Sequence, residues 1–392
     1  MLKRVSPICI LILTLFYLQI SAFSEIVKGP YLCDVTETSV VICWETDRPT
    51  KSAVEYADEA RYLASGGRYD RRVENRDKVE LHAVPLQGLK PSTLYHYRVI
   101  SGDDPSEDNT FHTAVTWREP FTVIVYGDCR TDQNAHRSVV ERIIEHKPDL
   151  VLNTGDMVSD GRVSSQWDTF FDVAGELMRN LPYYPVLGNH ERNAQNYYDL
   201  FHLPKGGGWE EEQWYSFDYG NAHFICLDSN FRFSADQTMW LGKDLARAAP
   251  KSEWIFVLFH HPPFSSGRHG GAAETMTGWI DLFEKYEVDI IFSGHDHTYE
   301  RSFHNGIWYI VTGGGGAPLY PVNFNPNPHQ VYAESAYHFC KLKIEGTGIY
   351  FEMIRADGSV GDSMTLTSAP ATPVNPLDKL PVIWGDLKSD RH

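Results

Sequence analysis

Two patterns of hydrophobic and polar positions divide the chain. From residue 25 to about residue 114, short runs rich in β-branched and aromatic residues alternate with Gly, Pro and Asp, as around the stretch SVVICWET. Several short strands at this spacing are typical of a β-sandwich. Within the stretch, alternation places Val40, Ile42 and Trp44 on one face, so we expect Trp44 in a core. The first segment therefore predicts an all-β domain.

From Phe121 the pattern changes to strands that alternate with helices. The apolar runs FTVIVYGD and DLVLNTGD predict buried strands, and NAHRSVVERIIEHKPD between them predicts an amphipathic helix. The alternation recurs through WIFVLFHHPP, TGWIDLFEKY and VDIIFSGHDH, and further strands are expected after His304. Such a repeat predicts a layered α/β domain over residues 120–367, with ligands at the strand ends.

The two ends of the chain differ from the rest. Residues 1–24 combine Lys3 and Arg4 with an apolar stretch and small residues near Ser24, which predicts a cleaved secretory signal peptide. The alternative is an uncleaved anchor, but the apolar stretch is shorter than the roughly 20 residues that span a bilayer. We therefore expect a secreted or periplasmic protein with no stable membrane insertion after cleavage. Residues 368–392 are rich in proline and predict a loosely attached tail.

The charge of the chain excludes one group of partners. Of the 35 basic residues two lie in the predicted signal, so 33 remain against 52 acidic residues, a net charge of −19. This balance argues against nucleic acid or an anionic membrane surface as a partner. An acidic protein that binds an anionic ligand needs local positive charge, which bound metal can supply.

Five of the expected strands end in similar polar clusters. They are GDCR at 127–130, GDMVSDG at 155–161, GNHE at 188–191, HHPP at 260–263 and GHDH at 294–297. Any one of them could be a turn, a helix cap or a structural histidine. All five at the same end of successive parallel strands would bring Asp, Asn and His into one crevice. Such oxygen and nitrogen donors suit Zn, Mn and Fe.

In this order the five motifs resemble those of the purple acid phosphatase branch of the calcineurin-like metallophosphoesterases. The segment VKGPYLCDVTETSVVICWETD is similar to the start of that family's N-terminal domain. The resemblance implies a fibronectin type III-like β-sandwich over 25–114, followed by a four-layer α-β-β-α sandwich over 120–367. It also implies a secreted phosphatase that hydrolyses small phosphate monoesters by attack of a metal-bound hydroxide. The oligomeric state is left open.

The resemblance further implies ligands for two metal ions. Asp156 would bridge both ions, a role that suits a carboxylate because its two oxygens can bind separate cations. The first ion would be held by Asp128, Asp156 and His297, and the second by Asp156, Asn189, His260 and His295.

The residues implied near the substrate include two histidines. Asn189 and His190 match positions that face the phosphate, and His269 matches a position where plant members of the family place another histidine. Either histidine could stabilise the phosphoryl charge or protonate the leaving alkoxide. His269 could equally be a mobile loop residue, and Glu191 could orient His190 or cap the next helix.

The chain departs from the family pattern at two positions. The metal-binding tyrosine of the family falls at Ser159, and the glycine of the first motif falls at Arg130. Without the phenolate, a divalent pair is favoured over ferric iron, so we expect two ions drawn from Fe, Zn or Mn. The guanidinium of Arg130 could bind the substrate phosphate. Alternatively, it could pair with Asp160 or another loop carboxylate.

Two other functions remain open from the sequence. Nothing in the residues excludes phosphodiesters, so a divalent-metal phosphodiesterase is one alternative. A catalytically silent secreted binding protein is the other, since the chain has a β-domain and lacks the family tyrosine. The six retained ligand positions favour an enzyme.

Overall fold

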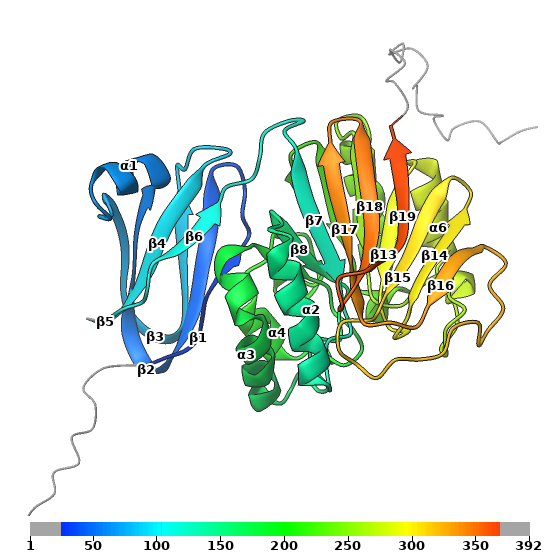
Figure 1. Ribbon diagram of the computed structural model, residues 1–392, viewed down its shortest axis with the longest axis horizontal. Coiled ribbons are helices and arrows are strands. Elements are labelled where there is room, and N and C mark those ends of the chain that lie inside the picture. The colour runs from blue at the N-terminus through cyan, green and yellow to red at the C-terminus, as the bar shows by residue number, and fades with distance from the viewer. Residues whose placement is uncertain (1–24, 103, 369–392) are drawn as a thin grey trace, which may run out of the picture.

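The computed structural model describes residues 25–102 and 104–368, which form two domains side by side (Figure 1). The predicted signal peptide, and the predicted tail beyond residue 368, lie outside the described residues. Within the described ranges, no helix is both long and apolar enough to cross a bilayer.

The N-terminal domain is a sandwich built around one long strand. The first half of β2 pairs with β1 and β3, and its second half pairs with β3 and β4, with register shifts between Glu45 and Ser52. The strand thereby contributes to both faces of the sandwich. The strands are β1 (Ile26–Cys33), β2 (Ser39–Asp58), β3 (Arg71–Gln87), β4 (Leu94–Ser101), β5 (Asp104–Pro105) and β6 (Asn109–His112).

The core of this domain contains the predicted tryptophan. Trp44 is fully buried and its indole N–H donates to Ser101 Oγ at 2.8 Å, so its predicted core position is confirmed. The all-β prediction holds except for the short helix α1 (Glu59–Ala64), which was not predicted. Asp58 caps this helix because its carboxylate accepts a hydrogen bond from the backbone N–H of Arg61 at 3.0 Å.

The second domain contains two mixed sheets. In the six-stranded sheet, β7, β8 and β9 run parallel and β17 to β19 add antiparallel strands, in the order β19-β18-β17-β7-β8-β9. Its strands are β7 (Phe121–Tyr126), β8 (Leu150–Asn153), β9 (Tyr183–Pro185), β17 (His338–Glu345), β18 (Gly348–Arg355) and β19 (Val360–Thr367).

The seven-stranded sheet has a parallel centre formed by β11, β12, β13 and β15, in the order β10-β11-β12-β13-β15-β14-β16. Its strands are β10 (Tyr215–Tyr219), β11 (Ala222–Cys226), β12 (Trp254–Leu258), β13 (Ile290–Ser293), β14 (Tyr299–His304), β15 (Ile307–Thr312) and β16 (Gln330–Glu334). The helices of the domain are α2 (Gln133–Glu145), α3 (Ser164–Asn180), α4 (Gln195–Leu200), α5 (Ala235–Ala248) and α6 (Thr277–Lys285).

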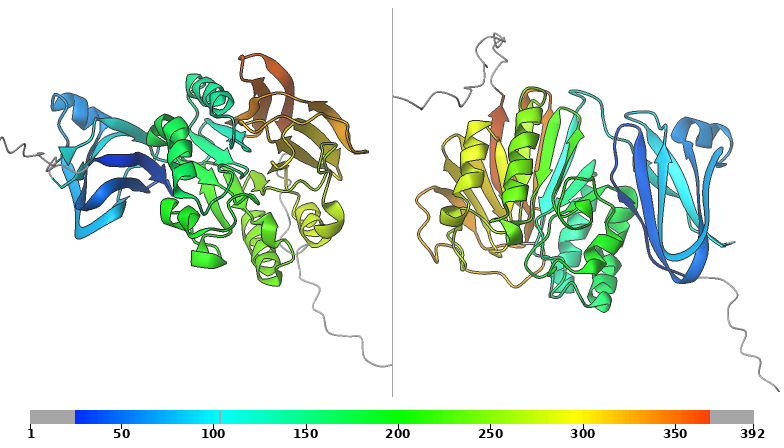
Figure 2. Two further views of the ribbon diagram at one scale, coloured as in Figure 1. Left: turned by 90° about the horizontal axis from the view of Figure 1, so that it is seen from below. Right: turned by 180° about the vertical axis from the view of Figure 1, so that it is seen from behind.

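Alternation along the strands of the seven-stranded sheet assigns its two faces. Phe224, Phe256 and Phe292 belong to the core that it shares with the other sheet. Their strand neighbours Ile225 and Val257 belong to a separate core beneath α5 and α6. From behind, α5 and α6 lie over this sheet (Figure 2), whereas α2 and α3 are on the side seen in Figure 1. The domain is thus the expected four-layer α-β-β-α sandwich.

Two parallel strand pairs begin in the same way. Asp149 lies just before β8 and accepts a hydrogen bond from the N–H of Thr122 in β7 at 2.7 Å. Asp289 lies just before β13 and accepts one from the N–H of Ile255 in β12 at the same distance. These bonds fix where each pair starts. Because the strands are short, they also fix where the polar motifs emerge at the other end.

The two domains share a packed interface. The hydroxyl of Tyr184 in β9 accepts from the N–H of Val35 at 3.0 Å and donates to the Val35 carbonyl at 2.9 Å. Lys28 pairs with Asp168 of α3 at 2.6 Å, and Tyr31 joins the hydrophobic core of the second domain. The N-terminal domain therefore supports β9, the strand that leads into the GNHE motif.

Removing the Tyr184 hydroxyl tests this support. Tyr184→Phe leaves a buried N–H of Val35 without a partner, so we expect a loss of about 1–3 kcal/mol in the free energy of unfolding. Denaturant unfolding measures it. Tyr350→Phe is the control, because Tyr350 is exposed and is expected to change stability by less than about 0.5 kcal/mol. Equal effects of the two variants would contradict the assigned role.

The partly buried carboxyl of Asp289 makes stability depend on pH. Burial raises its pKa from 3.8 to about 7. The resulting stabilisation is fully present below pH 3.8 and is lost as the pH rises through 7, a loss of about 2–4 kcal/mol. Asp289→Asn keeps an oxygen for the Ile255 N–H but cannot ionise. We expect it to be more stable than the native protein at pH 8 and similar to it at pH 4.

Urea unfolding across this pH range checks the expectation. Asp172→Asn, at an exposed position of α3, is the control and is expected to leave the pH dependence unchanged. An unchanged pH dependence in Asp289→Asn would show that this carboxyl is not the group responsible.

Candidate functional site

The five polar motifs meet although their strands belong to two different sheets. Three motifs follow β7, β8 and β9 of the six-stranded sheet, and two follow β12 and β13 of the seven-stranded sheet. One donor atom each of Asp128, Asp156 and His260 lies within 4.8 Å of the others, and all three residues are buried. The sandwich of two sheets thus brings together residues that are far apart in the sequence.

The backbone at the motifs is held in an uncommon conformation. Asp128, Asp156 and His295 have φ values of 55°, 55° and 69°, in the left-handed region. Non-glycine residues there cost of order 1–3 kcal/mol and cluster at functional sites. Close approach also requires glycine at Gly188, where a Cβ atom would lie 2.2 Å from Asp156 Oδ1. The strained backbone conformation of these residues directs their side chains toward the site.

One group of atoms that could bind a metal ion, called donors here, surrounds His260. Its Nε2 lies 3.2 Å from Asn189 Oδ1, 3.3 Å from His295 Nδ1 and 3.4 Å from Asp156 Oδ1. The Nδ1 of His260 lies 2.8 Å from the carbonyl of Thr154, which can only accept, so Nδ1 donates and the lone pair is on Nε2. This lone pair points at the other three donors.

A second group of donors surrounds Asp128. Its Oδ1 lies 3.6 Å from His297 Nε2 and, among the described residues, is a buried oxygen without a hydrogen-bond partner. The Nδ1 of His297 donates to the carbonyl of Pro318 at 2.7 Å, so the lone pair of His297 is also on Nε2. A buried carboxylate oxygen facing an imidazole lone pair is a site that fits a cation.

Burial sets the charges of these groups. It lowers the pKa of His260 and His295, and lowers that of His297 to about 4, so all three are neutral at pH 7 and can act as ligands. Burial and then the charge of Asp156 raise the pKa of Asp128 well above its usual range. Burial also opposes ionisation of Asp156, but nearby His260, His190 and Arg130 outweigh it and lower its pKa. Two carboxylates this close need a cation to be charged together.

Glu191 has a role that the sequence did not indicate. Its buried carboxylate accepts hydrogen bonds from the backbone N–H groups of Gly188, Met157 and Asp156 at 2.7, 2.8 and 2.9 Å. It makes none of the contacts expected for orienting His190 or capping a helix. Burial and the charge of Asp156 raise its pKa to about 8. These hydrogen bonds link the GNHE motif, which contains Glu191, to the GDMVSDG motif.

His190 is held beside the two groups of donors. Its Nδ1 donates to the backbone carbonyl of Ser159 at 2.6 Å, and its Nε2 lies 3.8 Å from Asp156 Oδ2. Position 159 therefore contributes to the site through its main chain, whereas its N–H binds the side chain of Gln166 at 2.8 Å.

His269 is hydrogen-bonded to a neighbouring loop through its backbone. Its backbone N–H donates to Asp296 Oδ1 at 2.8 Å, and Asp296 also accepts from Ser265 Oγ at 2.5 Å. The ring centroids of His269 and His295 are 4.3 Å apart. The structure thus brings His269 to the edge of the site.

Arg130 also lies within the site. Its Nε is 3.3 Å from Asp156 Oδ2, and its Nη2 is 3.5 Å from His297 Nε2. Pairing with Asp160 was one possibility from the sequence, but Asp160 instead binds Arg162 at 2.5 Å. The carboxylate that Arg130 contacts is Asp156.

Sequence reasoning missed Tyr320. Its ring stacks on His297, with centroids 4.1 Å apart and planes 17° apart, and lies 5.6 Å from the ring of His269. It comes from the loop after β15. The Gly run at 313–316 was the available signal that this loop passes close to the site.

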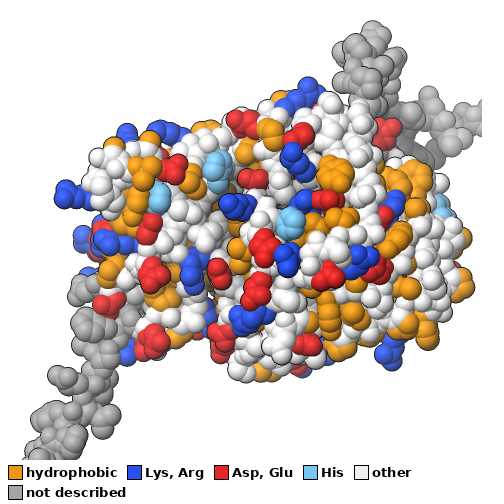
Figure 3. Space-filling model, viewed as in Figure 1, with side chains coloured by type: hydrophobic (Ala, Val, Ile, Leu, Met, Phe, Trp, Pro, Cys, Tyr) orange, Lys and Arg blue, Asp and Glu red, His pale blue; other side chains and the backbone are white. Residues whose placement is uncertain are grey.

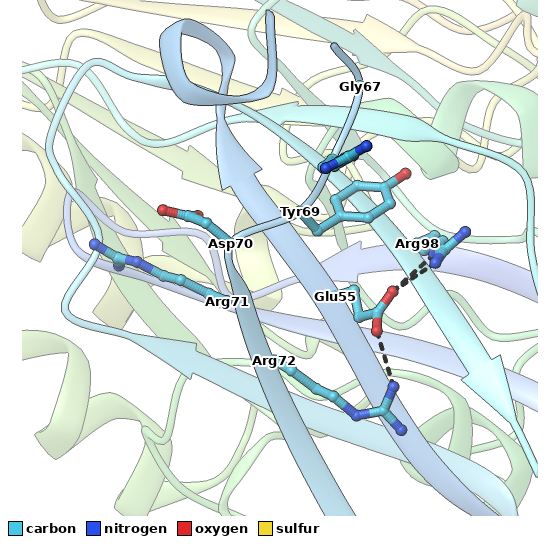
Figure 4. A pocket seen from close by; sticks show the side chains of 8 residues that line it. Glu55, Gly67, Tyr69, Asp70, Arg71, Arg72 and Arg98 are labelled. Carbon is cyan, nitrogen blue, oxygen red and sulfur yellow. Dashed lines mark hydrogen bonds and ion pairs between the residues drawn. The ribbon is translucent and has the colours of Figure 1, made fainter. Parts of the chain in front are cut away.

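A pocket of about 380 Å³ occurs in the N-terminal domain (Figure 4). Glu55 on its floor accepts hydrogen bonds from Arg98 at 2.7 and 2.9 Å and from Arg72 at 2.9 Å. Glu55 and Asp70 offset only part of the charge of the four arginines that line the pocket, and no His is among its lining residues, so the pocket lacks the mixed donor set of a metal site. On the face shown in Figure 3, acidic and basic side chains are interspersed. The motif cluster is therefore the candidate site.

Comparisons with known proteins identify the family of this chain. The family model for the purple acid phosphatase N-terminal domain matches residues 31–113, that for calcineurin-like phosphoesterase matches 121–299, and that for the iron/zinc purple acid phosphatase-like protein C matches 306–363. A purple acid phosphatase from yellow lupin (Lupinus luteus) seeds has the same fold, with a TM-score of 0.75 over 89% of this chain and 78% of that chain at 20% identity.

Two curated relatives show how far the similarity extends. A phosphoenolpyruvate phosphatase of Allium cepa is 29% identical over 73% of this chain, and acid phosphatase type 7 of Mus musculus is 26% identical over 83%. The matches span 65% and 87% of those two proteins. Fold and site together define a metallophosphoesterase. The chain belongs to the purple acid phosphatase family of the calcineurin-like phosphoesterases.

Glu191→Gln tests the bond that joins the two motifs. Above pH 8, where Glu191 is ionised, the amide of the variant places a donor against backbone N–H groups, so at least one N–H loses its acceptor and we expect a loss of about 2–4 kcal/mol in the free energy of unfolding. Glu176→Gln, at an exposed position of α3, is the control and is expected to cost less than about 0.5 kcal/mol. Denaturant unfolding of both variants measures the difference, and a cost no larger than that of the control would refute the role.

Proposed function

We propose that the protein is a secreted, dinuclear metal-dependent phosphatase that hydrolyses small phosphate monoesters. The observation that carries the proposal is the position of Asp156 between two groups of donors. Its Oδ1 faces the group around His260, and its Oδ2 faces Arg130 and His190. One of its oxygens also lies within 4.8 Å of a carboxylate oxygen of Asp128. A carboxylate so placed can bind two cations through separate oxygens. Secretion rests on the composition of residues 1–24.

The proposed ligands follow from these two groups. Asp128, Asp156 and His297 would hold the first ion, and Asp156, Asn189, His260 and His295 would hold the second. A divalent pair drawn from Fe, Zn or Mn is favoured because Ser159 offers no phenolate. Bound ions of this kind supply Lewis acidity toward phosphate oxygens and make a coordinated water more acidic.

The remaining residues act on the substrate. Arg130 offers N–H donors to the phosphate oxygens, and Asn189, whose Oδ1 lies 3.2 Å from His260 Nε2, is the other residue proposed to bind the phosphate. His190 uses Nδ1 to bind the Ser159 carbonyl, so Nε2 is the atom that can hold and deliver a proton to the leaving alkoxide. His269, at the edge of the site, is the second candidate for this proton transfer.

Asp156→Asn tests the bridging role. The amide has one weak oxygen donor in place of two anionic ones, so we expect hydrolysis of p-nitrophenyl phosphate to fall at least a hundredfold, roughly, and fewer than two ions to bind. Asp160→Asn is the matched control four residues away, because Asp160 pairs with Arg162 outside both donor groups. Unchanged hydrolysis in Asp156→Asn would refute the bridge.

Ester hydrolysis and metal binding by the same purified protein distinguish the phosphatase from the two alternative functions. Faster turnover of bis(p-nitrophenyl) phosphate than of the monoester would favour a phosphodiesterase. Two bound ions without turnover of either ester would favour a silent binding protein. Binding of fewer than about one ion per chain at saturation would exclude every two-metal mechanism.

A further inference from the structure

Arg130 contacts donor atoms that the first metal ion would use. Its side chain is 16% exposed, and its guanidinium approaches Asp156 Oδ2 at 3.3 Å and His297 Nε2 at 3.5 Å. A guanidinium has only N–H donors and stays protonated at any pH at which the protein is folded. Toward these two atoms it therefore acts as a permanent cation.

The contact with His297 is the informative one. Because Nδ1 of His297 donates to the Pro318 carbonyl, Nε2 has a single lone pair facing the site. That lone pair can accept a guanidinium N–H or bind a metal ion, but not both. Metal binding at the first position must therefore displace Arg130 from His297, and must also act against its charge.

The second position lacks such a competitor. The Nε2 of His260 is surrounded by Asn189 Oδ1, His295 Nδ1 and Asp156 Oδ1. Among the described residues, no Lys or Arg contacts these three atoms. Arg130 contacts only the other oxygen of Asp156, Oδ2. Binding a metal ion therefore costs more free energy at the first position than at the second.

From this asymmetry we propose that Arg130 is an internal cation that competes with the metal at the first position, so that the second position fills at a much lower metal concentration. The inference rests on the proposed two-metal function. Once displaced, the guanidinium has no vacant carboxylate at Asp160, which is paired with Arg162, and it becomes available to a phosphate oxygen. Phosphate and the first metal ion should consequently bind cooperatively.

Titration of the metal-stripped protein with Mn²⁺ tests the proposal, with calorimetry and the electron paramagnetic resonance signal of free Mn²⁺ as readouts. In the native protein we expect two events whose Kd values differ at least about a hundredfold. In Arg130→Ala the weaker event should tighten at least tenfold, roughly, while the tighter one changes by less than about twofold. His297→Ala should abolish the weaker event only, which assigns it to the first position.

Arg268→Ala is the matched control. Arg268 lies over the ring of Tyr320, with its guanidinium carbon 5.4 Å from the centroid, so the variant removes a positive charge near the site without touching Asp156. It should leave both Kd values unchanged. Equal tightening in this control would mean that overall charge, and not the contact of Arg130, sets the affinity, and would overturn the proposal. Arg130→Gln keeps part of the stem if Arg130→Ala does not fold.

Inorganic phosphate provides the second readout. At millimolar concentration it should tighten the weaker Mn²⁺ event in the native protein and have less effect in Arg130→Ala. Two events of unequal affinity that Arg130→Ala leaves unchanged would overturn the role of Arg130 and leave the two-metal function intact. Failure to bind even one ion would instead overturn the proposed function itself.

Discussion

The site depends on compensating the negative charge of three buried carboxylates. Asp128, Asp156 and Glu191 are each at most 1% exposed, and an uncompensated charge in such surroundings is expensive. Backbone N–H groups meet part of the demand: Glu191 accepts several, Asp128 accepts from His295 at 2.9 Å, and Asp156 accepts from His190 at 3.0 Å. Without a further cation, burial and mutual repulsion raise the pKa of Asp128 and of Glu191, so a bound cation would stabilise their charged forms.

The same burial keeps the histidines of the site neutral and able to bind a metal ion. Removal from water disfavours their charged form, and carbonyl groups such as those of Thr154 and Pro318 fix which ring nitrogen donates. The lone pairs then point at the carboxylates. A site with neutral imidazoles and excess negative charge attracts cations, and among the described residues Arg130 is the guanidinium that contacts Asp156. Its presence makes the two halves of the site unequal.

Support for this arrangement comes from packing well outside it. The parallel strands are only three to six residues long, so a shift at their starts would displace every motif. Asp149 and Asp289 fix two starts, and the N-terminal domain holds β9 through Tyr184. The β-domain is therefore part of what positions Asn189 and His190, the residues that follow β9.

The sequence by itself indicated the β-domain, the alternation of strands and helices after it and the five motifs, because period-two and helical patterns and strand-end polar clusters are local properties. It did not indicate the helices α1 and α3. It could not determine that β17 pairs with β7, that β15 lies inside its sheet, or that the motif strands divide between two sheets. Nor could it assign Glu191 to three backbone N–H groups, Tyr320 to the face of His297, or Arg130 to Asp156 instead of Asp160. These depend on which distant segments share a buried volume, and only the tertiary structure decides that.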